Sequence, residues 1–297
     1  MSRFAKYTWI TLVTNFGVIL WGAFVRATGS GAGCGEHWPT CNGEVIPRAE
    51  AIETMIEFTH RLTSGVALLM TVALVIWAVR LFERGHRVRK AAWTTLSFML
   101  AEAALGAGLV LFGLVANDDS VARAVVMCMH LLNTLFLLGA MALTAWWADR
   151  PGEIALDDGP TLGLGLGFAG LFLVGVSGAI AALGDTLFPA ASLIDGLYAD
   201  LDPSSHFLIR LRGYHPVFAL VVGFGLMSFA RRFRADPNTA RLATALMALI
   251  GIQIAVGFIN LGLLAPVPLQ LIHLLLADMV WVVFVLLSAT TLNRAAS

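Results

Sequence analysis

The sequence predicts an all-α integral membrane protein with eight transmembrane helices, arranged as two pseudo-symmetric four-helix bundles. Three observations support this fold class: the composition, a series of eight apolar segments, and a repeat that relates the two halves of the chain. Of the 297 residues, 58% are hydrophobic and 13% are charged, whereas soluble proteins carry roughly 25% charged residues. The formal net charge is zero. This composition excludes an ordinary soluble domain, and we do not expect nucleic acid to be a partner.

Each apolar segment is long enough to cross a bilayer, which takes about 20 residues of helix. The breaks between segments are short and polar or rich in Gly and Pro, except for two long loops at 27–54 and 185–210. The first apolar run leads to Gly-Ser-Gly and not to a small-residue cleavage site, so we expect a retained helix and no cleavable signal peptide. The eight predicted spans are 8–26, 55–81, 92–115, 122–147, 161–184, 211–231, 240–264 and 268–292.

The distribution of Lys and Arg predicts the orientation in the membrane. With an even number of spans, both termini lie on one side, and that side collects thirteen of the nineteen Lys and Arg residues. Because basic residues are concentrated on the cytoplasmic side of membrane proteins, we expect both termini in the cytoplasm and both long loops outside.

The two halves of the chain, residues 1–150 and 151–297, resemble copies of each other. Each half contains four spans, and its long loop follows the first of them. Since four is an even number, the copies share one orientation, which is a parallel repeat about an axis along the membrane normal. The segments that align are L-W-G-A-F (20–24) with V-S-G-A-I (176–180), L-G-A-G-L-V-L (105–111) with V-G-F-I-N-L-G (256–262), and M-H-L-L-N-T-L-F-L-L (129–138) with I-H-L-L-L-A-D-M-V-W (272–281).

Four histidines occupy matched places in this repeat, each near the outer end of an even-numbered span. A single histidine in a membrane helix is more often a hydrogen-bonded packing residue than a ligand. Two per half at one depth are better explained by a planar cofactor in each half, held axially by two imidazoles, which suggests haem. A non-haem metal usually takes three or four protein ligands, including carboxylates or thiolates. The four are His60, His130, His215 and His273; we assign no role to His206 in the second loop.

Glu57 is the residue that distinguishes the two halves. It precedes His60 by three residues and therefore shares its helix face. A carboxylate near the hydrocarbon is costly and indicates a functional site, although it could instead only cap a helix N-terminus. The matching position before His215 is Arg212. Such an asymmetry suggests that one half carries out chemistry and that the other serves structure or electron transfer.

The first long loop contains two cysteines, Cys34 and Cys41, in a segment rich in Gly and Pro that can turn back on itself. On an oxidising outer side they can form a disulfide. This disulfide would be either a structural staple over the first-half site or a redox-active pair. Four arginines on the outer side either extend to lipid headgroups or pair with haem propionates. They are Arg26, Arg61, Arg210 and Arg212.

Three motifs together resemble the heme A synthase family, and the resemblance covers nearly the whole chain. They are E-F-T-H-R (57–61), G-C-G-E-H-W-P-T-C-N-G (33–43) and H-F-L-I-R-L-R-G-Y-H-P (206–216). The resemblance implies an oxidoreductase that converts the C8 methyl group of haem O to a formyl group, giving haem A for cytochrome oxidase. It also implies successive hydroxylations, with oxygen taken from water, through a geminal diol that loses water.

The resemblance also implies a role for each half and for individual residues. Residues 1–150 would form the substrate side, and residues 151–297 would hold a haem b cofactor. The paired loop cysteines occur in only one branch of the family, so they cannot be universally required. The implied assignments are His60 and His130 at the haem O iron, His215 and His273 at the haem b iron, Glu57 as the essential carboxylate, and Cys34 with Cys41 as the paired loop cysteines.

The implied setting is the bacterial cell (inner) membrane, with haem O synthase as donor of the substrate and cytochrome oxidase assembly as the destination of the product. The sequence does not identify the electron acceptor and leaves homo-oligomerisation open. An alternative is a bis-histidine dihaem electron-transfer protein of the cytochrome b type, which explains four histidines but not the unmatched Glu57. A transporter with a parallel repeat would have broken helices at mid-membrane, whereas we expect the titratable groups here at the outer rim.

Overall fold

The structure is a computed structural model that describes residues 1–48, 51–150, 153–154 and 160–294. Across these residues it contains ten α-helices, and its β-strands are a two-residue antiparallel pair, β1 (Glu153–Ile154) with β2 (Asn293–Arg294). Eight helical segments are long and apolar enough to cross a membrane. The predicted all-α, multi-pass fold class is therefore confirmed. The predicted division between residues 150 and 151 falls beside 151–152 and 155–159, which lie outside the described residues.

All eight predicted spans are present, and their ends differ from the prediction by about five residues or fewer. The differences arise because capping side chains, and not the apolar runs, set the helix starts. Ser2 accepts a hydrogen bond from the Ala5 backbone N–H, and His86 accepts one from Val88. The spans are α1 (Arg3–Ala27), α2 (Ile52–Leu81), α3 (Arg87–Leu111), α4 (Val121–Trp147), α5 (Thr161–Leu187), α7 (Phe207–Arg212) with α8 (Tyr214–Arg231), α9 (Ala240–Gly262) and α10 (Val267–Thr291).

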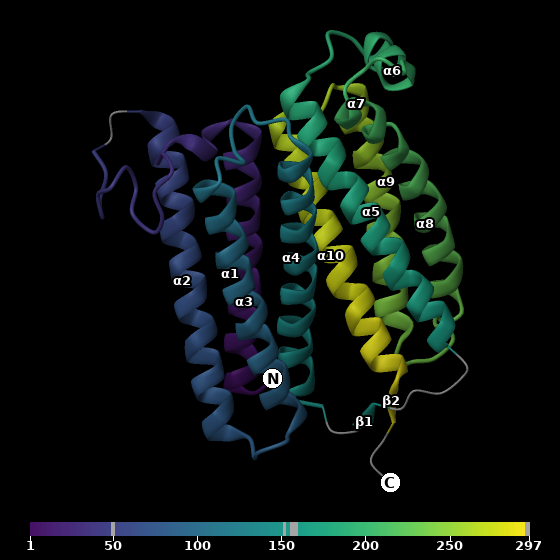
Figure 1. Ribbon diagram of the computed structural model, residues 1–297. Helices are drawn as coiled ribbons and strands as arrows, with labels where there is room; N and C mark the ends of the chain where they lie inside the picture. The colour runs from purple at the N-terminus through teal and green to yellow at the C-terminus, as the bar shows by residue number, and fades with distance from the viewer. Residues whose placement is uncertain (49–50, 151–152, 155–159, 295–297) are drawn as a thin grey trace.

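The spans form two closed rings of four helices, which stand side by side in Figure 1. In the first ring α1, α2, α3 and α4 pack in order, and α4 returns to α1. In the second ring α5, α8, α9 and α10 do the same, and α10 returns to α5. The N-terminus and the last described residues lie at one end of the molecule, and α6 lies at the other end. The two rings thus repeat the same neighbours in the same order.

The rings meet along α4 and α10, which carry the longest series of buried side chains among the spans. Trp281 lies at the centre of this seam, and its indole N–H donates to the carbonyl oxygen of Leu135 at 2.6 Å. The rings of Phe168 and Phe172 pack against the same indole, with centroids 5.5 and 5.2 Å away. The main hydrophobic core of the molecule therefore lies between the two rings.

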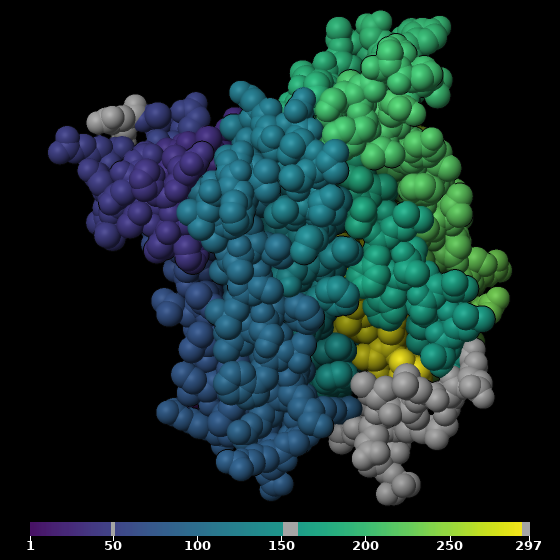
Figure 2. Space-filling view, in the orientation of Figure 1, coloured from purple at the N-terminus to yellow at the C-terminus, as the bar shows by residue number. Residues whose placement is uncertain are grey.

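The second long loop is more ordered than the sequence analysis expected. Residues 185–210 were predicted as a loop, but they include α6 (Leu193–Leu201), which Ser192 caps, and the start of α7. Helix α6 has too few apolar positions to be recognised as a span, and the helical spacing of those positions was not recognised. Helix α7 is followed directly by α8, with Pro216 in the first turn, where a missing N–H is tolerated. Figure 2 shows that the first loop and the α6 region both project from the body at the same end.

Candidate functional site

His60 and His215 both lie against a glycine of the preceding apolar span, in α1 and α5 respectively. A Cβ atom added to Gly22 of α1 would be 2.8 Å from Cε1 of His60, closer than a real contact allows. A Cβ atom added to Gly178 of α5 would be 3.0 Å from Cε1 of His215. Gly22 and Gly178 are also the aligned residues of the repeat. Glycine at these positions therefore makes room for an imidazole against bare helix backbone.

His130 and His273 repeat the same arrangement on the other two helix pairs. A Cβ atom added to Gly106 of α3 would be 4.0 Å from Cε1 of His130, and one added to Gly257 of α9 would be 3.0 Å from Cε1 of His273. These two glycines are again aligned in the repeat. All four predicted histidines therefore project from an even-numbered span onto a glycine of the neighbouring odd-numbered span.

The geometry of His215 and His273 suits a shared metal. Their ring centroids are 6.3 Å apart and their planes are perpendicular. Two imidazoles on opposite sides of one metal, with bonds of about 2 Å and ring centres about 1.1 Å beyond each nitrogen, would have centroids about 6 Å apart. Ser177 Oγ lies 3.1 Å from Nδ1 of His215, a contact that orients the ring and leaves Nε2 for a ligand bond. This pair therefore fits an axially bound haem.

His60 and His130 are the corresponding pair in the first ring, and they lie close enough to interact electrostatically. Nδ1 of His60 and of His273 is buried and has no hydrogen-bond partner among the described residues, whereas Nδ1 of His130 makes no hydrogen bond there but lies at ion-pair distance from a carboxylate. Since buried polar atoms are nearly always paired, two imidazole nitrogens without a partner are unusual. They are consistent with rings that receive another partner when a cofactor or substrate is bound.

Two residues that contact these histidines were missed by the sequence analysis. Oε1 of Glu102 in α3 lies 3.4 Å from Nδ1 of His130. Nε2 of Gln253 in α9 lies 3.3 Å from Nε2 of His273. The alignment of 105–111 with 256–262, continued three residues towards the N-terminus, pairs Glu102 with Gln253 and could have identified both.

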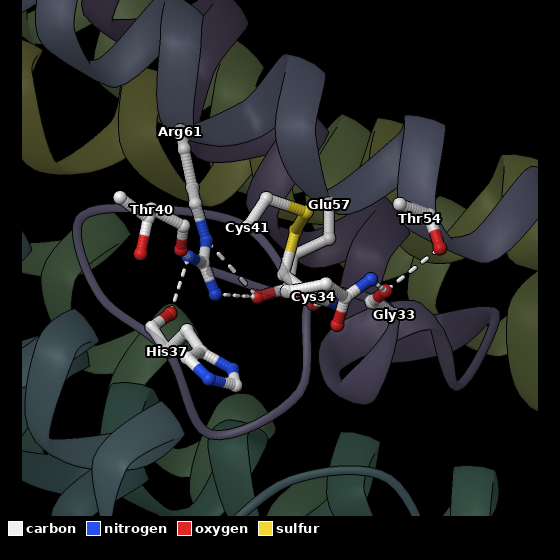
Figure 3. Close-up of polar contacts among 9 residues, drawn as sticks. Gly33, Cys34, His37, Thr40, Cys41, Thr54, Glu57 and Arg61 are labelled. Atoms are coloured by element: carbon white, nitrogen blue, oxygen red, sulfur yellow. Dashed lines mark hydrogen bonds and ion pairs between the residues drawn. A yellow bond between two sulfur atoms is a disulfide. The ribbon is translucent and has the colours of Figure 1, made fainter. Parts of the chain in front are cut away.

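Glu57 is at the centre of a hydrogen-bonded cluster that joins α2 to the first loop (Figure 3). Its side chain is buried, and Oε2 accepts a hydrogen bond from the backbone N–H of Cys34 at 2.8 Å. Oε1 accepts from Nε of Arg61 at 3.1 Å and forms an ion pair with the same guanidinium. Nη1 of Arg61 also donates to the carbonyl oxygens of His37 and Thr40, at 2.6 and 2.5 Å. One arginine therefore binds both the carboxylate and the loop that covers it.

The loop is fixed on both sides of this cluster. A disulfide joins Cys34 and Cys41, and both residues are buried. Thr54 Oγ1 donates to the carbonyl oxygen of Gly33 at 2.7 Å, as Figure 3 shows. A Cβ atom on Gly33 would lie 2.5 Å from the backbone carbonyl carbon of Glu53, so only glycine allows the loop to approach α2 this closely. The loop is thus held directly on the start of α2.

Arg26 connects the two rings. Its Nη1 donates to the carbonyl oxygen of Ala182 and to Oγ1 of Thr186, at 2.6 and 2.5 Å, and its Nη2 donates to Oε1 of Gln270 at 2.8 Å. The first two partners lie in α5 and the third in α10. The guanidinium of Arg26 therefore already makes three hydrogen bonds to other residues of the protein.

Arg212 and Arg210 differ in whether their side-chain donors already bind other residues of the protein. Arg212 is buried and binds Asp200 at 2.7 Å, Asp185 at 3.2 Å and the carbonyl oxygen of Phe188 at 3.1 Å. Arg210 is exposed, and its guanidinium forms no hydrogen bond or ion pair with the described residues. Of the four predicted propionate partners, Arg210 is the one whose donors are uncommitted within the part of the chain that the structure describes.

Asp278 departs from the expectation that titratable groups lie only at the outer rim. It lies well inside α10, its exposed fraction is 1%, and its Oδ2 has no hydrogen-bond partner among the described residues. His206, to which no role was assigned, caps α7 and lies 3.7 Å from Asp119 in the loop between α3 and α4. Neither residue belongs to the repeated histidine pattern, so the sequence alone predicts no function for either.

Known proteins resemble this chain over different lengths. The sequence pattern of the COX15-CtaA family, described as cytochrome oxidase assembly protein, matches residues 5–285. Two proteins named protoheme IX farnesyltransferase, from two strains of Thermus thermophilus, are 51% identical over 300 residues, which cover 99% of this chain and 49% of each relative. The chain therefore spans about half the length of these relatives.

Other relatives carry a different name and match a shorter part of the chain. The heme A synthase of Alkalihalophilus pseudofirmus is 41% identical over 112 residues, which cover 38% of each protein. The heme A synthase of Bacillus mycoides is 40% identical over 116 residues, which cover 38% of this chain and 37% of the relative.

Proposed function

This chain belongs to the COX15-CtaA family of cytochrome oxidase assembly proteins, and we propose that it is a heme A synthase that oxidises the C8 methyl group of haem O to a formyl group. The observation that carries the proposal is an asymmetry between the two histidine pairs. Each ring presents two histidines against glycine backbone, but a buried carboxylate held by a disulfide loop precedes the first histidine by three residues in the first ring, where the second ring has Arg212. In this proposal residues 1–150 form the substrate half and residues 151–297 the cofactor half.

In the second ring, His215 and His273 would hold haem b. The centroid separation of their rings and the glycines behind them support this assignment. Ser177 would keep the His215 ring in the orientation that leaves Nε2 free. When bound, haem b supplies one-electron transfer. Arg210, with uncommitted donors, is the arginine best placed to meet a propionate at the outer surface.

In the first ring, His60 and His130 would bind the iron of haem O, and Glu57 would act on the water that supplies oxygen. Oε2 of Glu57 accepts one hydrogen bond, from Cys34, and so retains capacity to accept another from a water molecule. A carboxylate in this position can orient the water and take its proton as the carbon–oxygen bond forms. Each hydroxylation adds one oxygen atom from water and releases two protons and two electrons, and the resulting diol loses water to give the formyl group.

The loop would keep Glu57 in place and separate it from solvent. Arg61 balances the buried charge and also binds two loop carbonyls, so that movement of the loop would move the carboxylate. We favour the disulfide as a staple for this loop, because it closes the segment that donates the Cys34 N–H. None of these contacts identifies the electron acceptor.

The setting of the reaction is also proposed. The protein would lie in the bacterial cell membrane with both termini in the cytoplasm, since thirteen of its nineteen basic residues are on that side. Haem O synthase would deliver the substrate, and cytochrome oxidase assembly would receive the product. Both sites would therefore face the outer half of the bilayer.

The name of the Thermus relatives offers a second candidate, transfer of a farnesyl group to protohaem IX. Those proteins are about twice as long as the region that matches this chain, and the family that matches residues 5–285 is the assembly family. These two comparisons favour oxidation over farnesyl transfer for this segment. A dihaem electron carrier remains the other alternative, and it provides no use for the Glu57 cluster.

Haem extraction and chromatography would distinguish all three candidates. In a host that makes haem O but lacks heme A synthase, expression of this chain should produce haem A. In a host that makes only protohaem IX, it should produce no haem O. Appearance of haem O in the second host would support the farnesyltransferase, and no new haem in either host, with haem bound to the protein, would support the electron carrier.

A further inference from the structure

We propose that Glu102 is a positioning residue that holds the imidazole of His130 and strengthens it as an iron ligand. As a result, the iron bound in the first ring would have a lower midpoint potential than the iron bound in the second. This inference rests on the proposed function, because it takes His60 with His130 and His215 with His273 as two pairs of haem ligands.

The carboxylate of Glu102 accepts hydrogen bonds from two residues of α4 and lies at ion-pair distance from His130. Oε1 lies 3.4 Å from Nδ1 of His130 and 2.5 Å from the hydroxyl oxygen of Thr134, which donates to it. Oε2 accepts a hydrogen bond from the amide of Asn133, and that amide also donates to the carbonyl oxygen of Phe98 at 2.9 Å. Asn133 and Thr134 are buried on the same helix as His130. Two neutral donors therefore support a carboxylate inside a membrane span, and one of its oxygens faces Nδ1 of the His130 imidazole.

The second ring has no such cluster among its described residues, although its helices correspond. Gln253 occupies the position of Glu102 in the repeat, but its amide nitrogen lies 3.3 Å from Nε2 of His273, whereas Glu102 faces Nδ1 of His130. The positions of Asn133 and Thr134 are taken by Leu276 and Ala277, neither of which has a side-chain donor. Oε1 of Gln253 is buried without a hydrogen-bond partner in the part of the chain that the structure describes. A neutral amide in an apolar setting thus replaces the supported carboxylate.

This difference has a defined effect on a metal ligand. A carboxylate that accepts the Nδ1–H of an imidazole fixes the ring and raises the basicity of its other nitrogen. Hydrogen bonding around the ligands is also one of the means by which a protein sets the potential of bound haem. A more basic ligand with a negative neighbour stabilises ferric over ferrous iron, whereas an amide carries no net charge. The Glu102 carboxylate would therefore lower the midpoint potential of an iron held in the first ring relative to that of an iron held in the second.

The test is a redox titration, followed by absorbance, of the 297-residue protein purified with its haem. Two reciprocal variants exchange the contacting residues: Glu102→Gln and Gln253→Glu. Glu102→Gln should raise the midpoint potential of the first-ring component and leave the second unchanged, and Gln253→Glu should lower that of the second-ring component. The components are assigned by His60→Ala and His215→Ala, which should each remove one of them.

Two further variants separate positioning from a general electrostatic effect. Asn133→Leu keeps the carboxylate but removes a donor, and it should shift the first-ring potential in the same direction by a smaller amount. Asp278→Asn removes another buried acid, whose Oδ2 has no hydrogen-bond partner among the described residues and which lies close enough to Glu102 to interact with it electrostatically. It should shift the potential less than Glu102→Gln does, and an equal shift would mean that His130 is not the route of the effect.

The outcomes also distinguish this inference from the proposed function. If both components are present and Glu102→Gln moves neither, the inference is wrong while the haem sites stand. If neither His60→Ala nor His130→Ala removes a haem component, the proposed function itself is wrong. Should Glu102→Gln fail to accumulate in the membrane, Gln253→Glu and Asn133→Leu still decide the matter, because unchanged potentials in both would overturn the inference.

Discussion

The first and second rings use the same scaffold to hold oppositely charged groups at equivalent places. Three residues before the first histidine of each ring, the first ring has Glu57, bound by Arg61 and a loop N–H. The second ring has Arg212, bound by Asp185 and Asp200. The first arrangement connects the first long loop to α2, which carries His60, and the second connects α5 and α6 to α7, which leads into the helix that carries His215. The repeated residues therefore place the histidines, and the residues that break the repeat distinguish the two rings.

The comparison predicts that loss of Glu57 has the largest effect on activity. Glu57→Gln keeps the shape of the side chain but removes its ability to take a proton. Since general-base catalysis contributes about 10²–10⁴-fold, haem A formation should fall by at least about a hundredfold while haem remains bound. Haem A yield per mole of protein, measured by extraction and chromatography, checks this.

The control for that experiment is Glu53→Gln. Glu53 lies one turn earlier on α2, and its side chain is exposed. This variant should form haem A at the normal rate. A normal yield from Glu57→Gln, or an equal loss from both variants, would contradict the catalytic role of Glu57.

Loss of a second-ring histidine should have the next largest effect. His215→Ala or His273→Ala removes one proposed axial ligand, so the purified protein should lose most of its haem b. The haem b content, determined from the pyridine haemochrome spectrum, measures this directly. His86→Ala is the matched control, because His86 lies at the other end of the molecule and caps α3. Unchanged haem b in both ligand variants would exclude the assignment.

Replacement of both loop cysteines tests whether the loop holds Glu57 in place. In the chain-entropy description, a closed loop of this length stabilises the fold by about 2–3 kcal/mol. Cys34→Ser with Cys41→Ser should therefore lower the thermal unfolding temperature and reduce haem A formation in part, because the Cys34 N–H is less well held.

A stapling role and a redox role give different results in that experiment. If the disulfide is only a staple, the double variant retains measurable activity, and added thiol reductant has no further effect on it. Complete loss of activity in a variant that still binds haem would instead favour a redox role. Cys128→Ser, which alters the free cysteine in α4, is the control for thiol removal.

The sequence predicts the spans well, and it identifies four histidines at matched places, because both depend on local, repeated features. A span requires only a long apolar run, and the glycine that faces each histidine recurs through the alignment, as Gly22 and Gly178 do. The cluster around Glu57 could be predicted in part, since Arg61 follows it by one helical turn. Its link to the backbone of Cys34 could not, because it depends on how the loop folds back onto α2.

Other features could not be predicted from the sequence pattern, and each has a physical reason. An arginine at position 26 is a residue type expected to pair with an anion. The tertiary fold instead brings α5 and α10 close enough to accept hydrogen bonds from its guanidinium. Asp278 and Glu102 lie within apolar runs, where a single acid does not interrupt a predicted span. Helix α6 is too short for a membrane pattern, so its residues were predicted as loop.

Substitution of the glycines that face the histidines should have the smallest effect on haem binding, and the size of the effect should follow the distance between the added methyl group and the imidazole. Gly22→Ala places a methyl group 2.8 Å from the His60 ring, whereas Gly106→Ala places one 4.0 Å from the His130 ring, an ordinary contact. Overpacking of this kind costs about 1–3 kcal/mol, so haem binding by the first ring should weaken about tenfold in Gly22→Ala. Gly106→Ala should bind haem almost normally. Haem titration of each variant measures the difference.

Gly17→Ala is the control within the same helix, because a Cβ atom there would meet nothing within 4 Å. Alanine also has a higher helix propensity than glycine, so this variant should be as stable as the parent or slightly more stable. If Gly17→Ala and Gly22→Ala weakened haem binding equally, the glycines would be needed for the backbone of α1 and not for the imidazole. A loss confined to Gly22→Ala would instead show that the first ring, like the second, places its histidine directly against a neighbouring helix.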